Sequence, residues 1–294
     1  MRTSNLRGIL SMLAAVTTFS VMDTILKRLS EDFPAMQVTF LRGAAALPLL
    51  IAANAVFGRW RDLKPKRFGL HVMRGFLSVA VLWFFVYAVS KLSLANAYSI
   101  FMSAPLLITA LSVPMLRERV GWQQWLAVFV GLVGVIIVLK PTGSGLVTLG
   151  GLAALTSAIG YALNAITVRI LTSTDTSAAT VFWSLFFVTI IGGVAASVRW
   201  VPVPWDYWPL IVGLGISGAL GQYFFTEAFR LAPPPVIAPL EYTALAWGMM
   251  FDWLLWATAP GLRMLTGAFV IVASGIYVLH RERFASDALQ QHQH

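Results

Sequence analysis

The sequence predicts an all-α integral membrane protein, with ten transmembrane helices arranged as two inverted five-helix repeats around a central cavity. Three observations predict this fold class. The chain of 294 residues is 58% hydrophobic and only 11% charged, with a mean hydropathy of +0.78, whereas a soluble domain is about half apolar and about a quarter charged. Ten apolar stretches are long enough to cross a bilayer, and the second half of the chain repeats the pattern of the first. A soluble fold is therefore excluded.

Each apolar stretch is close to the roughly 20 residues that a membrane-spanning helix needs. The connections between them are too short to hold a soluble domain. Arg2 and Arg7 before the first apolar run are also typical of a signal peptide, but nine further stretches follow, so a first transmembrane helix is the better interpretation. In chain order, the predicted spans are 8–27, 35–57, 70–90, 96–115, 122–139, 149–171, 178–198, 207–230, 235–256 and 262–280.

The Lys and Arg residues of the short connections predict the orientation of the spans. With a cytoplasmic N-terminus, 14 of these residues fall on the inside, 6 fall on the outside, and Arg42 lies within the second span. Arg74, near the start of the third span, is counted among the inside residues. We therefore expect a multi-pass protein of the plasma membrane, or bacterial inner membrane, with both termini in the cytoplasm. The net charge of +9 reflects this topology, and no nucleic-acid partner is expected.

The two halves of the chain, residues 1–140 and 141–294, are interpreted as two repeats that form one transport domain. LAVFVGLVGVIIVL at 126–139 matches GAFVIVASGIYVL at 267–279 with an offset of 141 residues, and FFVYA matches FFTEA with an offset of 140. Five spans in each half place the repeats in opposite orientations across the bilayer. Inverted repeats of this kind are typical of secondary transporters, whose binding site lies near the midplane between the repeats.

Prolines interrupt the fourth span of each half. Pro239, within the stretch LAPPPVIAPLEY at 231–242, lies inside the ninth span. It leaves the carbonyl group of position 235 without its helical donor and bends the helix. Pro105 lies in the corresponding fourth span. We expect both spans to act as hinges around the cavity, and passive kinking is the alternative.

Glu241 lies two residues after that proline, inside the same apolar stretch. An acid within a membrane span generally faces the bundle interior or a water-filled cavity and takes part in function. We expect Glu241 to couple transport to protons or to contact the ammonium group of a substrate. A protonated, hydrogen-bonded structural residue is the alternative.

Three further charged residues are candidates for coupling or for charge compensation. Arg42 is interpreted as the one cation in the middle of a span, and a structural pair with an acid is an alternative role. Asp23 is expected to pair with Lys27, one helical turn further on, and Glu227 with Arg230 in the same way. Both acids therefore rank below the acid of the ninth span as functional candidates.

Aromatic residues in or near the central parts of spans 3, 4, 6 and 8 predict a cavity for an amphipathic ligand. Tyrosine hydroxyl groups in an apolar setting need hydrogen-bond partners, and an amide in the sixth span could bond a polar head group. Core packing is the alternative role for each residue. The expected substrate-binding residues are Trp83, Tyr87, Tyr98, Met102, Tyr161, Asn164, Tyr223, Glu241 and Tyr242.

Other classes of protein lack their characteristic residues in this chain. It contains no cysteine, so disulfides and thiolate metal sites are excluded, and neither a metal nor a cofactor is expected. GLGISG at 213–218 matches a dinucleotide-binding pattern, but it lies inside an apolar span, where close helix packing explains it better. Since no zinc-protease or Walker motif is present, we expect no enzyme and no ATP-driven transport. An intramembrane enzyme that uses one Glu as a base is the remaining alternative.

Motifs from both halves are similar to those of one family of membrane proteins. They are Arg42, Pro105, RERVGWQQW at 117–125, GLVG at 131–134, AFRLAPPPVIAPLEYTALAW at 228–247 and GAFVIVASGIYV at 267–278. Through these motifs the chain resembles the drug/metabolite transporter superfamily, in particular its ten-helix EamA-type exporters.

The resemblance implies export of a small-molecule substrate across the lipid bilayer, with amino acids, including aromatic ones, as the substrates. Efflux of cationic drugs, with Glu241 as the counter-ion, is the alternative. The oligomeric state is left open, a monomer included.

Overall fold

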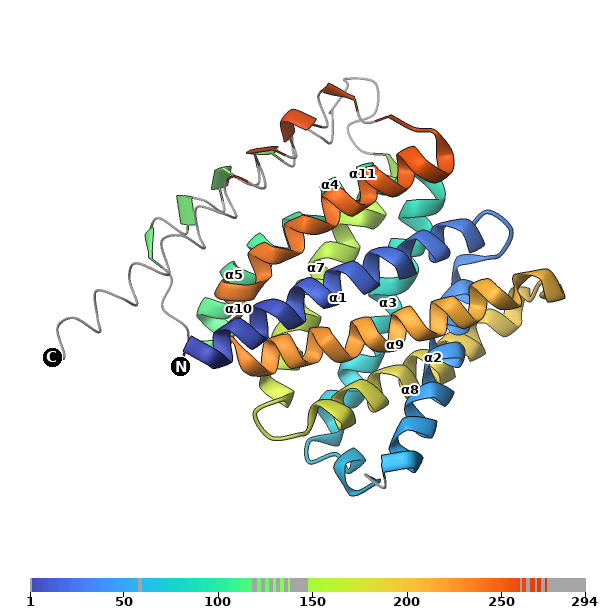
Figure 1. Ribbon diagram of the computed structural model, residues 1–294, viewed down its shortest axis with the longest axis horizontal. Coiled ribbons are helices and arrows are strands. Elements are labelled where there is room, and N and C mark those ends of the chain that lie inside the picture. Colours follow the sequence, from blue (N-terminus) through green and yellow to red (C-terminus); the bar gives the residue numbers. More distant parts are fainter. Residues whose placement is uncertain are drawn as a thin grey trace, which may run out of the picture.

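The computed structural model of the protein describes residues 2–57, 60–117 and 148–259, together with isolated residues between 121 and 137 and between 261 and 273. Figure 1 shows the described part of the chain as a bundle of helices, and it contains no strand. The α-helices are α1 (Arg2–Leu29), α2 (Ala35–Phe57), α3 (Phe68–Lys91), α4 (Leu94–Phe101), α5 (Ser103–Leu116), α7 (Leu149–Leu171), α8 (Ser177–Ala196), α9 (Trp208–Leu231), α10 (Pro234–Ile237) and α11 (Thr243–Trp256). The 3₁₀ turns are η1 (Trp60–Leu63), η2 (Ser197–Arg199), η3 (Trp205–Tyr207) and η4 (Ala238–Tyr242).

Seven helical segments among the described residues are long and apolar enough to cross a membrane. They correspond to the predicted spans 1–4 and 6–8 within a few residues, and α7 has the predicted bounds. The ninth predicted span is described as α10, η4 and α11. The predicted spans at 122–139 and 262–280 lie mostly outside the described residues, so the count of ten helices stays a prediction.

The two spans that contain the predicted hinge prolines are both broken. The chain leaves the helix at Met102, between α4 and α5, and Pro105 follows in the first turn of α5. Because proline has no N–H group, it cannot donate to the carbonyl group four residues earlier. Pro239 lies at the start of η4, which separates α10 from α11. The breaks agree with the sequence, whereas movement about them stays a prediction.

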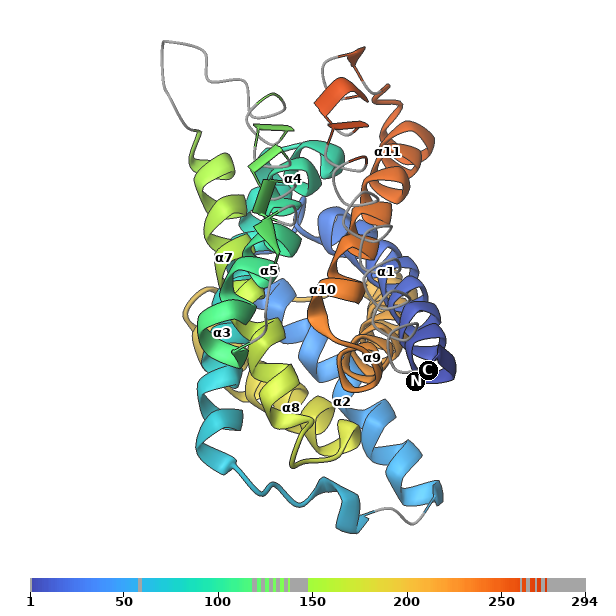
Figure 2. The same ribbon diagram turned by 90° about the vertical axis from the view of Figure 1, so that its left-hand side faces the viewer.

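The helices of the two halves pack against each other in a regular pattern. α1 packs along α9 and α3 along α7, whereas α2 packs on α8 and α4 on α11 (Figures 1 and 2). The first helix of each half therefore contacts the third helix of the other half, and the second and fourth helices contact their counterparts. This arrangement brings one face of α1, α2, α3, α7 and α9 to a common interior.

The glycines of GLGISG and the glycine after it allow α9 to approach α1 and α2. A Cβ atom built on Gly215 would lie 2.6 Å from the carbonyl oxygen of Ala45, and one built on Gly221 would lie 2.6 Å from the ring of Phe19. Real Cβ atoms do not approach other atoms so closely. Since small residues let the backbones of membrane helices approach each other, the expected role of this motif in helix packing is confirmed.

Candidate functional site

A cavity lies in the interior of the bundle, between the two halves of the chain. Its walls come from α1, α2, α3 and α4 of the first half and from α7, α8, α9, η4 and α11 of the second. The space between the side chains, including its open mouth, is about 920 Å³. The charged residues in its wall are Asp23, Arg42, Arg74 and Glu241. The wall therefore contains two acidic and two basic side chains.

Asp23 faces the cavity and not the lysine one helical turn further on. Its carboxylate accepts a hydrogen bond of 2.8 Å from the hydroxyl group of Tyr98 on α4. Lys27 instead lies 2.6 Å from Asp252 of α11. The expected pair of Asp23 and Lys27 is therefore wrong. Asp252 is 1% exposed, and a buried carboxylate needs a cation or several donors close by, which Lys27 provides across the bundle.

Glu241 lies in η4, is 4% exposed and forms part of the cavity wall. Its Oε1 atom has no hydrogen-bond partner in the protein. Tyr161 of α7, also in the wall, interacts with the carboxylate. Glu227 is different: it forms the expected pair with Arg230, at 2.5 Å, and lies outside the cavity wall. A buried oxygen without a protein partner is available to a proton, a water molecule or a substrate.

Arg74 is a cavity residue that the sequence analysis missed. It lies in α3, is 1% exposed and forms part of the wall together with Arg42. The interpretation of Arg42 as the one cation in the middle of a span is therefore wrong. Ser78 and Phe85 of the same helix also line the cavity, at spacings of four and eleven residues from Arg74. The sequence could have shown this, because Arg74, Ser78 and Phe85 share one face of a helix within an apolar segment. Counting Arg74 among the residues of the cytoplasmic connection obscured that pattern.

Hydrogen bonds hold both the arginine and its partner in α7. The Nε atom of Arg74 donates to Oδ1 of Asn164 at 2.8 Å, and its Nη1 atom donates to the carbonyl oxygen of Thr180 at 2.6 Å. Asn164 in turn donates to the hydroxyl group of Ser78 at 2.8 Å. The predicted cavity residue Asn164 is thus in the wall, where it positions a cation.

Six aromatic rings in the cavity wall form a continuous series, which we call the aromatic wall. Neighbouring ring centroids are 5.0 to 6.1 Å apart, and the angles between ring planes range from 22° to 66°. Such pairs contribute about 0.5–1.5 kcal/mol each beyond the burial of their surface. In spatial order the rings are those of Tyr98, Phe85, Phe101, Tyr161, Phe225 and Phe19. Met102 completes this part of the wall.

Four of the expected substrate-binding residues lie outside the cavity wall. Trp83 packs on Phe84, with ring centroids 4.8 Å apart. Tyr87 lies at the edge of a core cluster of α3, α4 and α7, and Tyr242 is 3% exposed within a second core cluster. Tyr223 is 44% exposed on α9. For these aromatic residues, packing or surface exposure describes the position better than contact with a ligand does.

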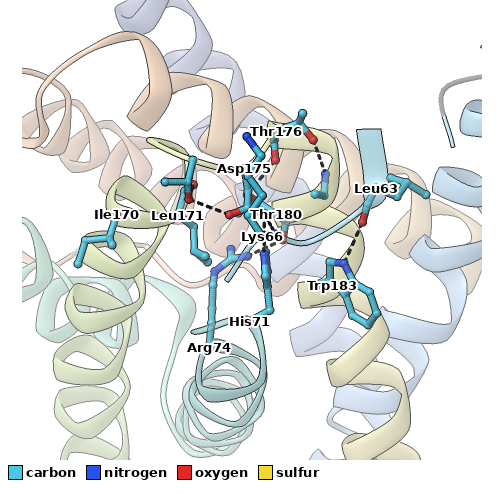
Figure 3. Close-up of polar contacts among 12 residues, drawn as sticks. Leu63, Lys66, His71, Arg74, Ile170, Leu171, Asp175, Thr176, Thr180 and Trp183 are labelled. Atoms are coloured by element: carbon cyan, nitrogen blue, oxygen red, sulfur yellow. Dashed lines mark hydrogen bonds and ion pairs between the residues drawn. The ribbon is translucent and has the colours of Figure 1, made fainter. Parts of the chain in front are cut away.

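Polar contacts join three segments at the end of the bundle where α1 begins. The Oδ1 atom of Asp175, between α7 and α8, accepts from the backbone N–H of Lys66 at 2.5 Å and lies 3.7 Å from Nε2 of His71. The indole of Trp183 donates to the carbonyl oxygen of Leu63 at 3.0 Å. Figure 3 shows these contacts beside the arginine of α3. They connect the segment before α3 to the start of α8.

An ion pair joins α1 to α11 at the opposite end. Oδ1 of Asp252 accepts from Lys27 at 2.6 Å and from the backbone N–H of Leu94 at 3.2 Å. The ammonium group of Lys27 also lies 4.1 Å from the ring centroid of Trp256. Removing one partner of a buried ion pair costs about 3–5 kcal/mol. This contact therefore holds α1, α4 and α11 together above the cavity.

An all-helical bundle with several apolar helices of membrane-spanning length and a charged, aromatic cavity between its halves is the architecture of a multi-pass membrane transporter. The chain belongs to the EamA-like transporter family, whose family model matches residues 6–140 and again residues 148–280. Because this is a family of transporters, the protein is a transporter and not an enzyme. It acts on a small-molecule substrate in a lipid bilayer.

Named relatives match along almost the whole chain. The riboflavin transporter of Vibrio cholerae is 27% identical over 281 residues, which cover 94% of each chain. The pseudopaline exporter CntI of Pseudomonas aeruginosa is 26% identical over 275 residues, 92% of this chain and 94% of the relative. The S-adenosylmethionine uptake transporter of Rickettsia conorii is 24% identical over 288 residues, 98% of this chain and 97% of the relative. These names agree on membrane transport and differ in substrate and in direction.

A protein of known crystal structure has the same fold. It superposes with a TM-score of 0.71 over 91% of this chain and 94% of that chain, at 19% sequence identity. The comparison concerns the fold alone.

Proposed function

We propose that the protein exports small amphipathic metabolites, with amino acids, including aromatic ones, as its substrates. The observation that carries the proposal is the cavity wall, which combines the aromatic wall with two acids and two arginines. A free amino acid carries a carboxylate, an ammonium group and an apolar side chain. Ligand sites generally combine an apolar lining with a few placed polar groups that fix the orientation of the ligand. The wall offers a complement to each part of such a molecule.

The proposed mechanism is alternating access between two inverted repeats, residues 1–140 and 141–294. Three features support the repeats: the family model matches each half separately, the helices of the halves pack in reciprocal pairs, and the fourth span of each half ends alike. Arg117 after α5 and Ala257 after α11 are the described non-glycine residues with positive φ, at 57° and 51°. In secondary transporters with inverted repeats, one repeat moves against the other around a central site. Opening the cavity beneath α1 and α11 then requires Lys27 and Asp252 to separate.

The proposed orientation has both termini and the segment before α3 in the cytoplasm, and it is testable because the natural chain contains no cysteine. We expect Asp206→Cys, in the exposed connection between α8 and α9, to react with a membrane-impermeant maleimide in intact cells. Lys64→Cys is expected to react only after permeabilisation, because positively charged connections stay inside. The measurement is gel detection of the labelled protein. The reverse labelling pattern would contradict the orientation.

The substrate proposal is tested by flux through purified protein in proteoliposomes. We expect saturable counterflow of labelled phenylalanine that exceeds the flux into protein-free vesicles, and its inhibition by other apolar amino acids. Riboflavin and a cationic dye are measured in parallel, because the first is named for a relative and the second represents drug efflux. Flux of riboflavin without any amino acid would replace the proposed substrate class. No flux under any gradient would contradict transport by the purified protein.

Efflux of cationic drugs is the second candidate function. The two carboxylates of the cavity, Asp23 and Glu241, favour it because they could neutralise a bound cation. The two arginines in the same wall oppose it, because a cationic ligand would bring further positive charge close to them. Flux of the dye without flux of amino acids in the same proteoliposomes would favour this candidate over the first.

A further inference from the structure

The two arginines of the cavity wall are buried, and among the described residues no carboxylate lies within ion-pair distance of either one. Arg42 is 7% exposed and Arg74 is 1% exposed. Buried cations are normally paired with an anion, because moving a charged group out of water costs roughly several kcal/mol and the attraction of an anion offsets that cost. The two arginines also interact electrostatically with each other, and Asp23 of the same wall interacts with Arg42 but not at ion-pair distance. Two like charges that share one low-dielectric cavity favour the entry of an anion.

Neutral groups orient the two guanidinium groups and leave donors free. Arg74 uses Nε and Nη1 for Asn164 and the Thr180 carbonyl oxygen, while its Nη2 atom is buried with no partner (Figure 3 shows the Thr180 side of this contact). Arg42 has one described hydrogen bond, from Nε to the sulfur of Met22 at 3.0 Å. A thioether is a weak acceptor. The remaining N–H groups of the two guanidinium groups can therefore donate to a carboxylate, whose two oxygen atoms accept two parallel hydrogen bonds from an arginine.

The acids of the same cavity are oriented by tyrosines and not by the arginines. Asp23 accepts its hydrogen bond from Tyr98, and Glu241 interacts with Tyr161. Both tyrosines belong to the aromatic wall, so each acid lies beside an aromatic ring. In the cavity wall, the acids and the arginines thus form hydrogen bonds with different neutral groups and not with each other. A ligand can therefore contact both the carboxylates and the guanidinium groups.

From this arrangement we infer that Arg42 and Arg74 together bind the carboxylate group of the substrate, so that the protein selects carboxylates over amines of the same shape. This inference rests on the proposed function, because it concerns the same cavity, and it names the group by which the substrate is recognised. The apolar part of the substrate lies along the aromatic wall. A lysine cannot replace either arginine fully, since one ammonium group lacks the planar fork that matches a carboxylate.

The test is binding of ligands that share a phenyl ring to the purified full-length protein, measured by calorimetry. We expect phenylalanine and 3-phenylpropionate to bind at least about tenfold more tightly than phenethylamine, which lacks the carboxylate; tenfold corresponds to about 1.4 kcal/mol. Arg74→Met and Arg42→Met are each expected to weaken binding of 3-phenylpropionate by at least about tenfold, whereas phenethylamine, a cation that the arginines repel, should bind as tightly as before or more tightly. Arg199→Met, which removes an exposed arginine of η2, is the matched control and should change neither.

Loss of binding in a variant must be distinguished from loss of folding of that variant. Replacing a buried charge by an apolar side chain removes the cost of its desolvation, but Arg74→Met also leaves Asn164 and the Thr180 carbonyl group without their donor, so the thermal unfolding temperature of each methionine variant is measured beside its binding. If one of them does not fold, the corresponding Arg→Lys variant keeps the charge, and it is expected to bind 3-phenylpropionate less tightly than the natural chain does.

Three results would overturn the inference: equal binding of 3-phenylpropionate and phenethylamine, carboxylate binding that survives both methionine variants, or competition by inorganic phosphate without binding of 3-phenylpropionate. The inference and the proposed function fail separately. Binding of 3-phenylpropionate that depends on the two arginines, without amino-acid flux, would retain the carboxylate site and reject the substrate. Amino-acid flux that is unchanged in Arg74→Met and Arg42→Met would retain the exporter and reject the carboxylate site.

Discussion

Glu241→Gln is expected to abolish the response of amino-acid flux to a proton gradient, with a decrease of at least about tenfold in gradient-driven transport. The carboxylate is 4% exposed, lies in the cavity wall and has an oxygen with no protein partner. Glutamine keeps the shape of the side chain and a carbonyl oxygen that can accept a hydrogen bond. It cannot release or take up a proton. A tenfold change in rate corresponds to about 1.4 kcal/mol in activation free energy.

Flux into proteoliposomes with and without a pH gradient measures this effect. Counterflow measured without a pH gradient distinguishes the two roles proposed for Glu241, which are proton coupling and contact with the substrate ammonium group. If Glu241 carries the proton, counterflow of phenylalanine persists in Glu241→Gln while the gradient-driven component is lost. If Glu241 contacts the substrate ammonium group, both decrease. Asp206→Asn, in the exposed connection between α8 and α9, is the control and should behave as the natural chain. Unchanged gradient-driven flux in Glu241→Gln would exclude both roles.

Gly215→Leu is expected to prevent folding, and Gly215→Ala to lower the free energy of unfolding by about 1–3 kcal/mol, the usual effect of overpacking a core. A Cβ atom at this position would lie 2.6 Å from the carbonyl oxygen and 2.9 Å from the Cβ atom of Ala45. Both contacts are with the body of α2, and the first is with its backbone. A change of rotamer therefore cannot relieve them, and α9 must move away from α2.

Size-exclusion profiles and thermal unfolding in detergent measure this loss. Gly69→Leu is the matched control, because a Cβ atom at that position of α3 meets nothing within 4 Å and leucine has a higher helix propensity than glycine. It is expected to be neutral or slightly stabilising. A Gly215→Leu variant with the profile and unfolding temperature of the natural chain would contradict the close packing of α9 on α2.

Local chemistry was sufficient to predict the helices and their interruptions. A run of about 20 apolar residues specifies a membrane helix wherever it occurs, which is why the bounds of α7 agree with the sequence to the residue. Proline removes its own hydrogen bond whatever surrounds it, so the breaks before Pro105 and around Pro239 were also predictable. The pair of Glu227 and Arg230 belongs to this class, because both residues lie within one turn of one helix.

The partners of the buried charges could not be predicted in this way. Asp23 and Lys27 are one turn apart on α1, yet the packing of α4 and α11 gives each a different partner. Lys27 and Asp252 are 225 residues apart in the chain. Arg74 looked like a loop cation because hydropathy averages over a window and hides one charged position at the start of a span. Only the burial of that position in α3 makes it part of the cavity.

The sequence by itself determined that this protein crosses the membrane many times, where most of its helices begin and end, and which spans break, because hydropathy and proline act on neighbouring residues. The tertiary structure decided which side chains meet in the cavity. That choice depends on the packing of α1, α2, α3 and α4 against α7, α8, α9 and α11, because in a low-dielectric interior each buried charge needs partners close in space, and these partners come from helices far away in the sequence.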